Sequence, residues 1–187
     1  MTETPRTGDA PRAGAESGAT KMGDETGPTM GLNDVPILLR RRIEAMILKH
    51  VLDIVTERSG RAEAEAVIGA ACSKSAIEQG QMLAAELGHA PDLTDFAAIQ
   101  PNWTREDALR IETIEMSEDK MDFNVVRCRY AEMYRDMGLG DIGHLLSCNR
   151  DGDFCIGYNP DIEMTRTQTI MKGASHCDFR YRMKKDA

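Results

Sequence analysis

The clearest helical pattern in the chain lies within residues 34–59. Large apolar side chains recur there every three or four positions, at Ile43, Ile47, Leu48, Val51, Leu52, Ile54 and Val55. This spacing predicts one helix with a broad apolar face, ending near Ser59. Asn33-Asp34 and Pro36 are typical of a helix start, and Gly60 is suited to the end. Alanine-rich residues 62–87, followed by Gly88, predict a second helix.

The hydrophobic period changes after a connector. Residues 89–102 contain Pro91 and Pro101 and predict a linking segment with one helical turn at 94–99. Residues 107–117 and 121–127 then alternate apolar and polar side chains around a polar turn, which predicts a β-hairpin. The alternation slips by one residue near Glu112–Thr113, and such a slip indicates a β-bulge.

The last third of the chain predicts two short helices and two more strands. The helices are expected at Tyr130–Met137 and Gly140–Cys148, and residues 152–160 are expected to be irregular. The strands are expected at Ile162–Ile170 and Cys177–Met183. The predicted fold is therefore α+β: an N-terminal helix pair, then an antiparallel sheet of about four strands in the order β-β-α-α-β-β, covered by helices.

Composition sets the limits of this domain. Residues 1–33 have almost no large apolar side chains and are expected to be a disordered tail. Residues 34–187 are expected to form one α+β domain, with a helical part (34–103) and a sheet part (104–187) that carries the cysteine motifs. The apolar face of the first helix suits an internal core, and it equally suits a homo-oligomer formed through the N-terminal helices.

Charge and hydropathy exclude several partners. The net charge of −8 argues against nucleic-acid binding, which needs a basic surface. No apolar run reaches the roughly 20 residues of a membrane helix, and the N-terminus has no signal-peptide core. We expect a soluble, cytoplasmic protein with no nucleic-acid or membrane partner. Its five cysteines are expected to be thiols there.

Three cysteines stand at or near the ends of predicted elements. Cys128 ends a strand, Cys148 ends a short helix, and Cys177 begins the last strand. Because element ends often meet at one edge of a sheet, these positions can converge on a binding site. Cys72 and Cys155 are interpreted as small core residues instead.

Two kinds of chemistry fit these cysteines. Cys128, His144, Cys148 and Cys177 could together bind zinc, although the chain has no Cys-x-x-Cys pair. Alternatively, one thiol could be a nucleophile activated by a base. His176 adjoins Cys177 but points to the opposite face of a regular strand, so His144 is the better candidate base. Arg127 and Arg129 flank Cys128 and could lower its pKa or bind a carboxylate.

The motifs after residue 127 resemble the L-2-amino-thiazoline-4-carboxylate hydrolase family. The resemblance is carried by Cys128-Arg-Tyr-Ala-Glu, Gly138-Leu-Gly-Asp-Ile-Gly with Cys148 and Asp151, Gly157-Tyr-Asn-Pro, and Thr167, Gly173 and Cys177-Asp-Phe-Arg-Tyr. It covers roughly residues 35–183. Ala174-Ser175-His176 replaces the acidic residue that usually follows the last glycine. The final motif is also similar to that of 4-vinyl-reductase-type small-molecule-binding domains.

The resemblance implies a hydrolase that opens a small cyclic amidine at a C–N or C–S bond without a cofactor. It implies a thiol nucleophile, Cys177 first and Cys128 second, with His144 as the base. Cys148, Asn149 and Tyr130 would shape the pocket, and Arg129 or Arg180 would bind a substrate carboxylate. The alternative is a non-enzymatic module that binds a small ligand, zinc or iron in a cysteine-lined pocket.

Overall fold

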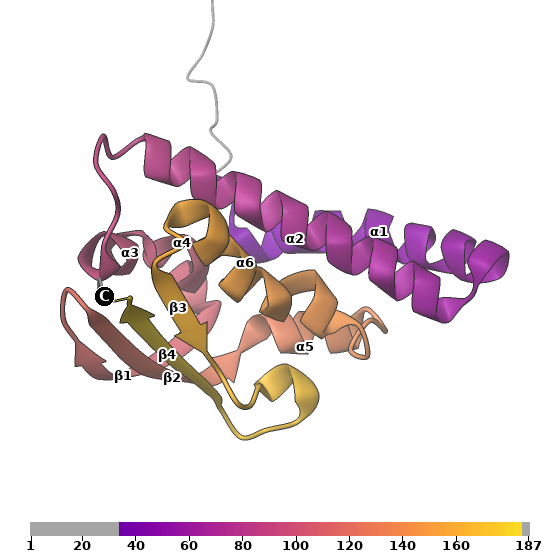
Figure 1. Ribbon diagram of the computed structural model, residues 1–187. Coiled ribbons are helices and arrows are strands. Elements are labelled where there is room, and N and C mark those ends of the chain that lie inside the picture. The colour runs from indigo at the N-terminus through magenta and orange to yellow at the C-terminus, as the bar shows by residue number, and fades with distance from the viewer. Residues whose placement is uncertain (1–33, 185–187) are drawn as a thin grey trace, which may run out of the picture. The chain divides into compact units, whose positions relative to one another are not determined.

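Two long helices open the folded part of the chain. The computed structural model describes residues 34–184, so the predicted disordered tail lies outside it (Figure 1). Helix α1 (Ile37–Ser59) and helix α2 (Arg61–Ala85) are joined at Gly60 and run side by side. Gly60 has a φ of 89°, a conformation that glycine adopts without steric cost. Within residues 34–184, no helix has both the length and the hydropathy needed to cross a membrane.

A four-stranded antiparallel sheet forms the other side of the fold. The short helices α3 (Leu93–Ile99), α4 (Pro101–Thr104) and η2 (Arg105–Asp107) lead into a hairpin of β1 (Leu109–Met116) and β2 (Lys120–Cys128). Strands β3 (Ile162–Thr165) and β4 (Cys177–Met183) complete the sheet in the order β1-β2-β4-β3. The predicted α+β fold, with its helix pair and four-stranded sheet, is confirmed.

Helix α6 (Asn149–Tyr158) lies between α2 and β3, and helix α5 (Arg129–Asp136) continues from β2 and packs against α1 (Figure 1). Helix α6 follows one π-helical turn, η3 (His144–Cys148), without a break. The prediction of irregular structure at 152–160 was wrong. Residues 149–158 form α6, and Gly157 lies where this helix crosses α2 so closely that any side chain would meet the backbone of Ile77. This glycine serves helix packing and does not break the helix.

The third predicted strand is also shorter than expected, because it ends at Thr165 and not at Ile170. The backbone N–H groups of Thr167 and Gln168 donate to the Asp178 carboxylate, at 3.0 and 2.8 Å. Since that side chain takes the place of a neighbouring strand as acceptor, the chain leaves the sheet. It then turns through the short helix η4 (Ile170–Lys172) and returns as β4.

Two β-bulges interrupt the hairpin. One is at Ile114 in β1, next to the predicted position, and the other is at Val126 in β2. A bulge adds one residue to a strand, so it reverses the inside-outside alternation beyond it. Val125 is buried, and the bulge at Val126 gives Cys128 the same inward face. The second bulge therefore determines which side chain β2 contributes at its end.

Candidate functional site

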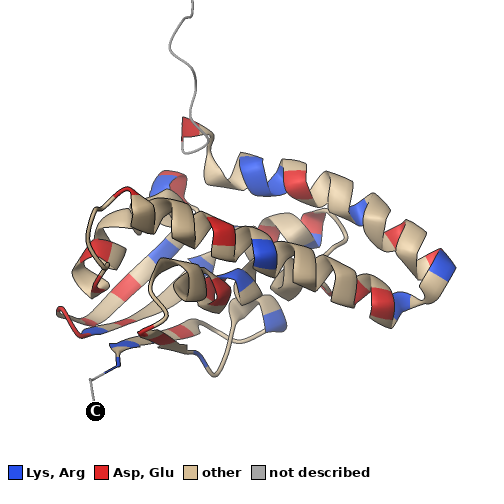
Figure 2. Ribbon diagram, turned by 45° about the horizontal axis from the view of Figure 1, so that its top comes forward, with Lys and Arg blue, Asp and Glu red and all other residues tan. Residues whose placement is uncertain are grey.

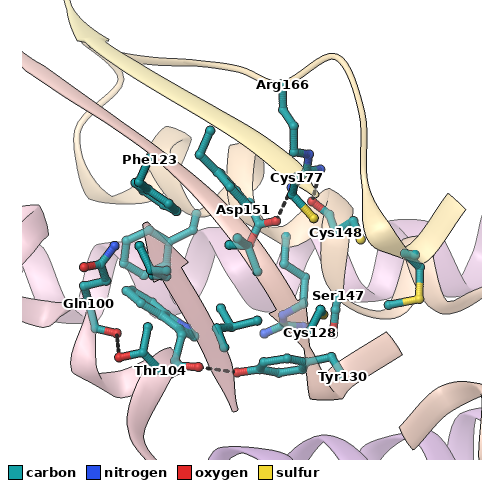
Figure 3. Close-up of a pocket in the computed structure, with 18 of the residues that line it drawn as sticks. Gln100, Thr104, Phe123, Cys128, Tyr130, Ser147, Cys148, Asp151, Arg166 and Cys177 are labelled. Carbon is teal, nitrogen blue, oxygen red and sulfur yellow. Dashed lines mark hydrogen bonds and ion pairs between the residues drawn. The ribbon is translucent and has the colours of Figure 1, made fainter. Parts of the chain in front are cut away.

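A small cavity lies between the sheet and the helices, with a volume of about 110 Å³. Its walls come from α1, α2, the α3–α4 segment, the inner face of the sheet, η3 and α6. Most of the lining is apolar and aromatic: Phe96, Trp103, Phe123, Phe154, Phe179 and Tyr181. Polar groups are few, as is typical of a small-molecule site. Figure 3 shows them projecting among the aromatic rings.

The cavity brings together the three cysteines at element ends. Cys177 is buried, and its Sγ accepts a hydrogen bond from the backbone N–H of Ile170 at 3.2 Å. Cys128 reaches the cavity from the end of β2, and Cys148 from the last residue of η3. Figure 3 places Cys177 and Cys148 on one side, with Cys128 beside Tyr130. Cys72 and Cys155 are buried and do not line the cavity.

The cavity keeps these thiols protonated. Burial raises the pKa of Cys128 to about 11, although the N–H groups of Ala131 and Tyr130 at the start of α5 oppose this. Burial also raises the pKa of Cys148 to about 12, with the Asp151 charge adding to the effect. The pKa of Cys177 is raised by burial, against the Ile170 N–H and Arg166. A thiolate would need to form with the help of a bound molecule or a base.

An ion pair between Arg166 and Asp151 lies beside Cys177. Arg166 Nη1 donates to the Asp151 carboxylate at 2.5 Å, and its Nη2 donates to the Cys148 carbonyl oxygen at 2.8 Å (Figure 3). The Arg166 guanidinium also lies over the Phe179 ring, 4.8 Å from its centre. Asp151 lines the cavity, and 37% of its side-chain surface is open. Protein surrounds this carboxyl, so the open surface faces the cavity.

Opposing effects act on the Asp151 carboxyl. Burial raises its pKa, and the positive charge of Arg166 lowers it, with smaller contributions from Arg150 and Arg41. Burial is the largest of these, so the pKa is raised. A carboxyl of this kind can exchange a proton close to neutral pH more readily than an exposed aspartate.

Two further arginines give the cavity a basic wall. Arg41 from α1 is only 3% exposed, and its Nη1 donates to both oxygens of Glu44, at 2.9 and 2.6 Å. Arg150 from α6 is also buried, and it donates to two neutral acceptors, the Cys72 carbonyl and Ser75 Oγ, at 3.3 and 3.4 Å. Within residues 34–184, no carboxylate lies within ion-pair distance of Arg150. Burial and the charge of Arg41 lower its pKa.

The sequence of the chain matches the family model of L-2-amino-thiazoline-4-carboxylic acid hydrolase over residues 40–181. This chain belongs to that family. The matched segment contains every residue that lines the cavity, from Arg41 to Tyr181. No curated protein matched the sequence. The family assignment agrees with the resemblance carried by the motifs after residue 127.

Two solved structures are similar to this family member at low sequence identity. One is the phenol-responsive sensory domain of the transcription activator PoxR with phenol. It has a TM-score of 0.45 and 14% identity, over 79% of this chain and 76% of that one. Another is a trafficking protein particle complex subunit 3 from Naegleria fowleri, covalently bound to palmitic acid. Its TM-score is 0.47 at 13% identity, over 79% of this chain and 96% of that one.

Several side chains predicted for the site lie elsewhere in this family member. Arg129 donates to the Glu106 carbonyl at the surface. Arg180 donates to the Phe123 carbonyl and the Asn124 side chain from the opposite face of the sheet. Neither guanidinium lines the cavity, and the arginines that do line it are Arg41, Arg150 and Arg166. Tyr130 does line it, and its hydroxyl donates to the Trp103 carbonyl at 3.0 Å.

His144 and Asn149 line a second, open hollow next to the cavity. Cys148 and Arg166 line both spaces, so they form the wall between them. The Nδ1 of His144 lies 3.1 Å from the Asp141 carbonyl oxygen, and the ring does not reach the cavity. His176 immediately precedes β4, hydrogen-bonds with Gln168 and Ser175, and does not line the cavity.

The zinc alternative finds no ligand set in the described part of the chain. Among residues 34–184, no three His, Cys, Asp or Glu side chains are grouped closely enough to hold a metal ion. His144 faces the second hollow, whereas Cys128 and Cys177 face the cavity. The three cysteines of the predicted zinc site therefore line the cavity, and the predicted histidine ligand does not.

Sequence reasoning missed the position of Arg166, which lines the cavity and pairs with Asp151. The alternation of residues 162–170 places this arginine on the same strand face as Ile162 and Met164. A charged residue within an apolar face is costly unless it is paired. That signal, together with Asp151 one helical turn after Cys148, could have indicated a buried ion pair.

Proposed function

We propose that the protein is a hydrolase that opens the ring of a small cyclic amidine bearing a carboxylate, the class that includes L-2-amino-thiazoline-4-carboxylate. The observation that carries the proposal is the content of the cavity, where a thiol, an acid and a buried arginine meet in a small aromatic space. Family membership supports the same reaction. At about 110 Å³, the cavity suits a single five-membered ring. For comparison, a cavity of about 150 Å³ holds benzene.

Substrate binding follows from the charges of the cavity. The carboxylate is assigned to Arg150, because the hydrogen bonds of this guanidinium go to two weak neutral acceptors. A charge-assisted hydrogen bond to the substrate carboxylate is stronger than these two bonds, so replacing them would favour binding. Arg41 adds a second positive charge, partly neutralised by Glu44. The ring then lies among the aromatic side chains, with its amidine carbon toward Cys177 and Asp151.

The first chemical step is ring opening. The Cys177 thiol attacks the amidine carbon as its proton passes to Asp151. The ring C–S bond then breaks, and the leaving sulfur takes that proton from Asp151. This leaves an isothiourea that links the opened substrate to Cys177. Asp151 takes the base role in place of His144, which lies outside the cavity.

The second step is hydrolysis of the adduct. Asp151 removes a proton from water, and the oxygen attacks the same carbon. Cys177 then leaves and recovers its proton from Asp151. The product is an N-carbamoyl cysteine, which equals substrate plus one water. One buried carboxyl thus accepts and returns a proton twice, as expected of a group whose pKa is raised by burial.

A set of single substitutions tests the proposal. Ring opening is followed by the free thiol that it releases, in Cys177→Ser, Cys128→Ser, Cys148→Ser and Asp151→Asn, with Cys72→Ser as the control for a buried thiol outside the cavity. We expect Cys177→Ser and Asp151→Asn each to lower kcat/KM at least 100-fold, with the control unchanged. Full activity in all three cavity serine variants would reject the thiol mechanism. Full activity in Asp151→Asn as well would reject this cavity as the active site.

A second candidate is a ligand-binding module without turnover. It is favoured by the raised pKa of the three cavity thiols, none of which is activated in the unliganded protein. Calorimetric titration with the thiazoline carboxylate separates the two functions. Heat of binding with no thiol release over hours would support the module. Thiol release at catalytic enzyme concentrations would support the hydrolase.

A further inference from the structure

Helix α1 is apolar on two faces, and residues 34–184 cover only one of them. Its inner face, which includes Ile37, Ala45 and Leu52, packs against α2 and α5. Its outer face carries Leu39, Ile43, Met46, Ile47 and Ile54, each between 49% and 64% exposed. They are five of the ten large apolar side chains exposed in the described chain. A helix that is apolar all round is normally covered on both sides.

The exposed side chains form one continuous stripe. With His50, they recur every three or four residues from Leu39 to Ile54, which is the spacing of a helix–helix seam. The stripe is about 22 Å long at about 1.5 Å per residue. From these features we infer that the outer face of α1 packs against the same face of a second copy of this chain, with the two helices antiparallel.

The stripe is symmetric about its own centre, as a two-fold interface requires. A two-fold axis between Met46 and Ile47 places Leu39 against Ile54 of the second copy. The same axis places Ile43 against His50 and Met46 against Ile47. Every large side chain of the stripe then meets another member of the stripe. A partner with a different sequence would not gain from this internal symmetry.

Charge favours the antiparallel arrangement. Basic residues lie in the first turns of α1 (Figure 2). Asp53 lies toward the end of this helix. Arg42 and Asp53 border the same side of the stripe, and neither makes an ion pair within residues 34–184. The two-fold axis brings Arg42 of one copy within about one helical turn of Asp53 of the other. A parallel pair would instead place Arg42 of one copy and Asp53 of the other about 16 Å apart along the helices and would align the two helix dipoles.

Sedimentation of the full chain over about 1–100 µM tests the inference, because dimer populations depend on concentration. We expect a dimer for the wild type and for Met82→Glu, a change at an equally exposed apolar residue of α2. We expect a folded monomer for Ile47→Glu, with circular dichroism as the measure of folding. A monomeric wild type, or a folded Ile47→Glu protein that remains dimeric, would overturn the assignment of this face.

Two further variants test the orientation. Arg42→Glu should weaken the dimer at least tenfold, and Arg42→Glu combined with Asp53→Arg should restore it. Met46→Cys, close to the two-fold axis, should form an intermolecular disulfide, whereas Leu39→Cys should not. The native cysteines are buried or half-buried, so they give little background. Efficient self-cross-linking of Leu39→Cys would overturn the antiparallel arrangement.

Discussion

The crossing of α2 and α6 gives a sharp test of how the site is built. Gly80 of α2 faces α6 so closely that an added Cβ would lie 2.7 Å from the backbone N of Tyr158 and 3.0 Å from the backbone C of Gly157. It would also overlap the Phe154 carbonyl oxygen. These are backbone atoms, so no rotamer change can relieve the overlap. Gly80→Ala therefore forces the two helices apart.

The size of the effect follows from two opposing contributions. Overpacking of a rigid contact costs about 3 kcal/mol, the upper end of the usual range. Replacing a helical glycine with alanine returns about 1 kcal/mol. The net loss is about 2 kcal/mol, or a melting temperature lower by about 4–8 °C for a chain of this size. Because α6 carries Arg150 and Asp151, ring-opening activity should fall as well.

Gly69 is the matched control on the same helix. Its added Cβ would meet only Leu145 Cδ2, at an ordinary 3.7 Å. Gly69→Ala should therefore keep full activity and gain about 0.5–1 kcal/mol of stability. Thermal unfolding followed by circular dichroism measures both variants. If Gly80→Ala is as stable as Gly69→Ala, then α2 and α6 do not pack as described, and the reasoning is refuted.

Two other predictions concern ionisation. Burial raises the pKa of Cys128 to about 11 and of Cys148 to about 12. Iodoacetamide should therefore label these two thiols of the folded protein slowly at neutral pH, and faster with each unit of rising pH. Mass spectrometry measures the labelling, and rapid modification of either thiol at pH 7 would contradict the prediction. The hydrogen bond from Arg182 lowers the pKa of Asp122, so this carboxylate stabilises the fold above its unfolded pKa of about 3.9 and less as pH falls below it. Asp122→Asn should therefore reduce stability in urea unfolding at neutral pH, and the difference from wild type should shrink in acid; a difference that stays constant with pH would count against the ion pair.

The spacing of apolar residues predicted those parts of the fold in which a single helix or strand buries one face. The helix pair, the hairpin and the inward face of β4 all follow from the spacing of apolar side chains. The errors occurred where a residue acts on a distant segment. Residues 152–160 were expected to be irregular, but they include most of α6, where Gly157 leaves room for the backbone of Ile77. The Asp178 carboxylate ends β3 from another strand, so the sequence around β3 does not show it.

The candidate site, like the fold, could be predicted from the sequence only in part. Cys128, Cys148 and Cys177 could be identified because each stands at an element end, and the structure places all three at one cavity. The buried charges could not be located in this way. Arg41 comes from the first helix, and Arg166 and Asp151 pair across 15 residues of sequence. Which charge enters a cavity depends on helix crossings that no local pattern encodes.

The sheet order has a consequence for how the chain folds. Strand β4 is the last to be synthesised, yet it lies in the interior of the sheet, between β2 and β3. Until it emerges from the ribosome, β3 has no strand partner and β2 has an open edge. Pairing of β4 also joins segments more than 50 residues apart, and such non-local contacts slow folding. The sheet can therefore form only after β4 has been synthesised, and deletion of this strand should leave an aggregation-prone intermediate in place of a smaller folded protein.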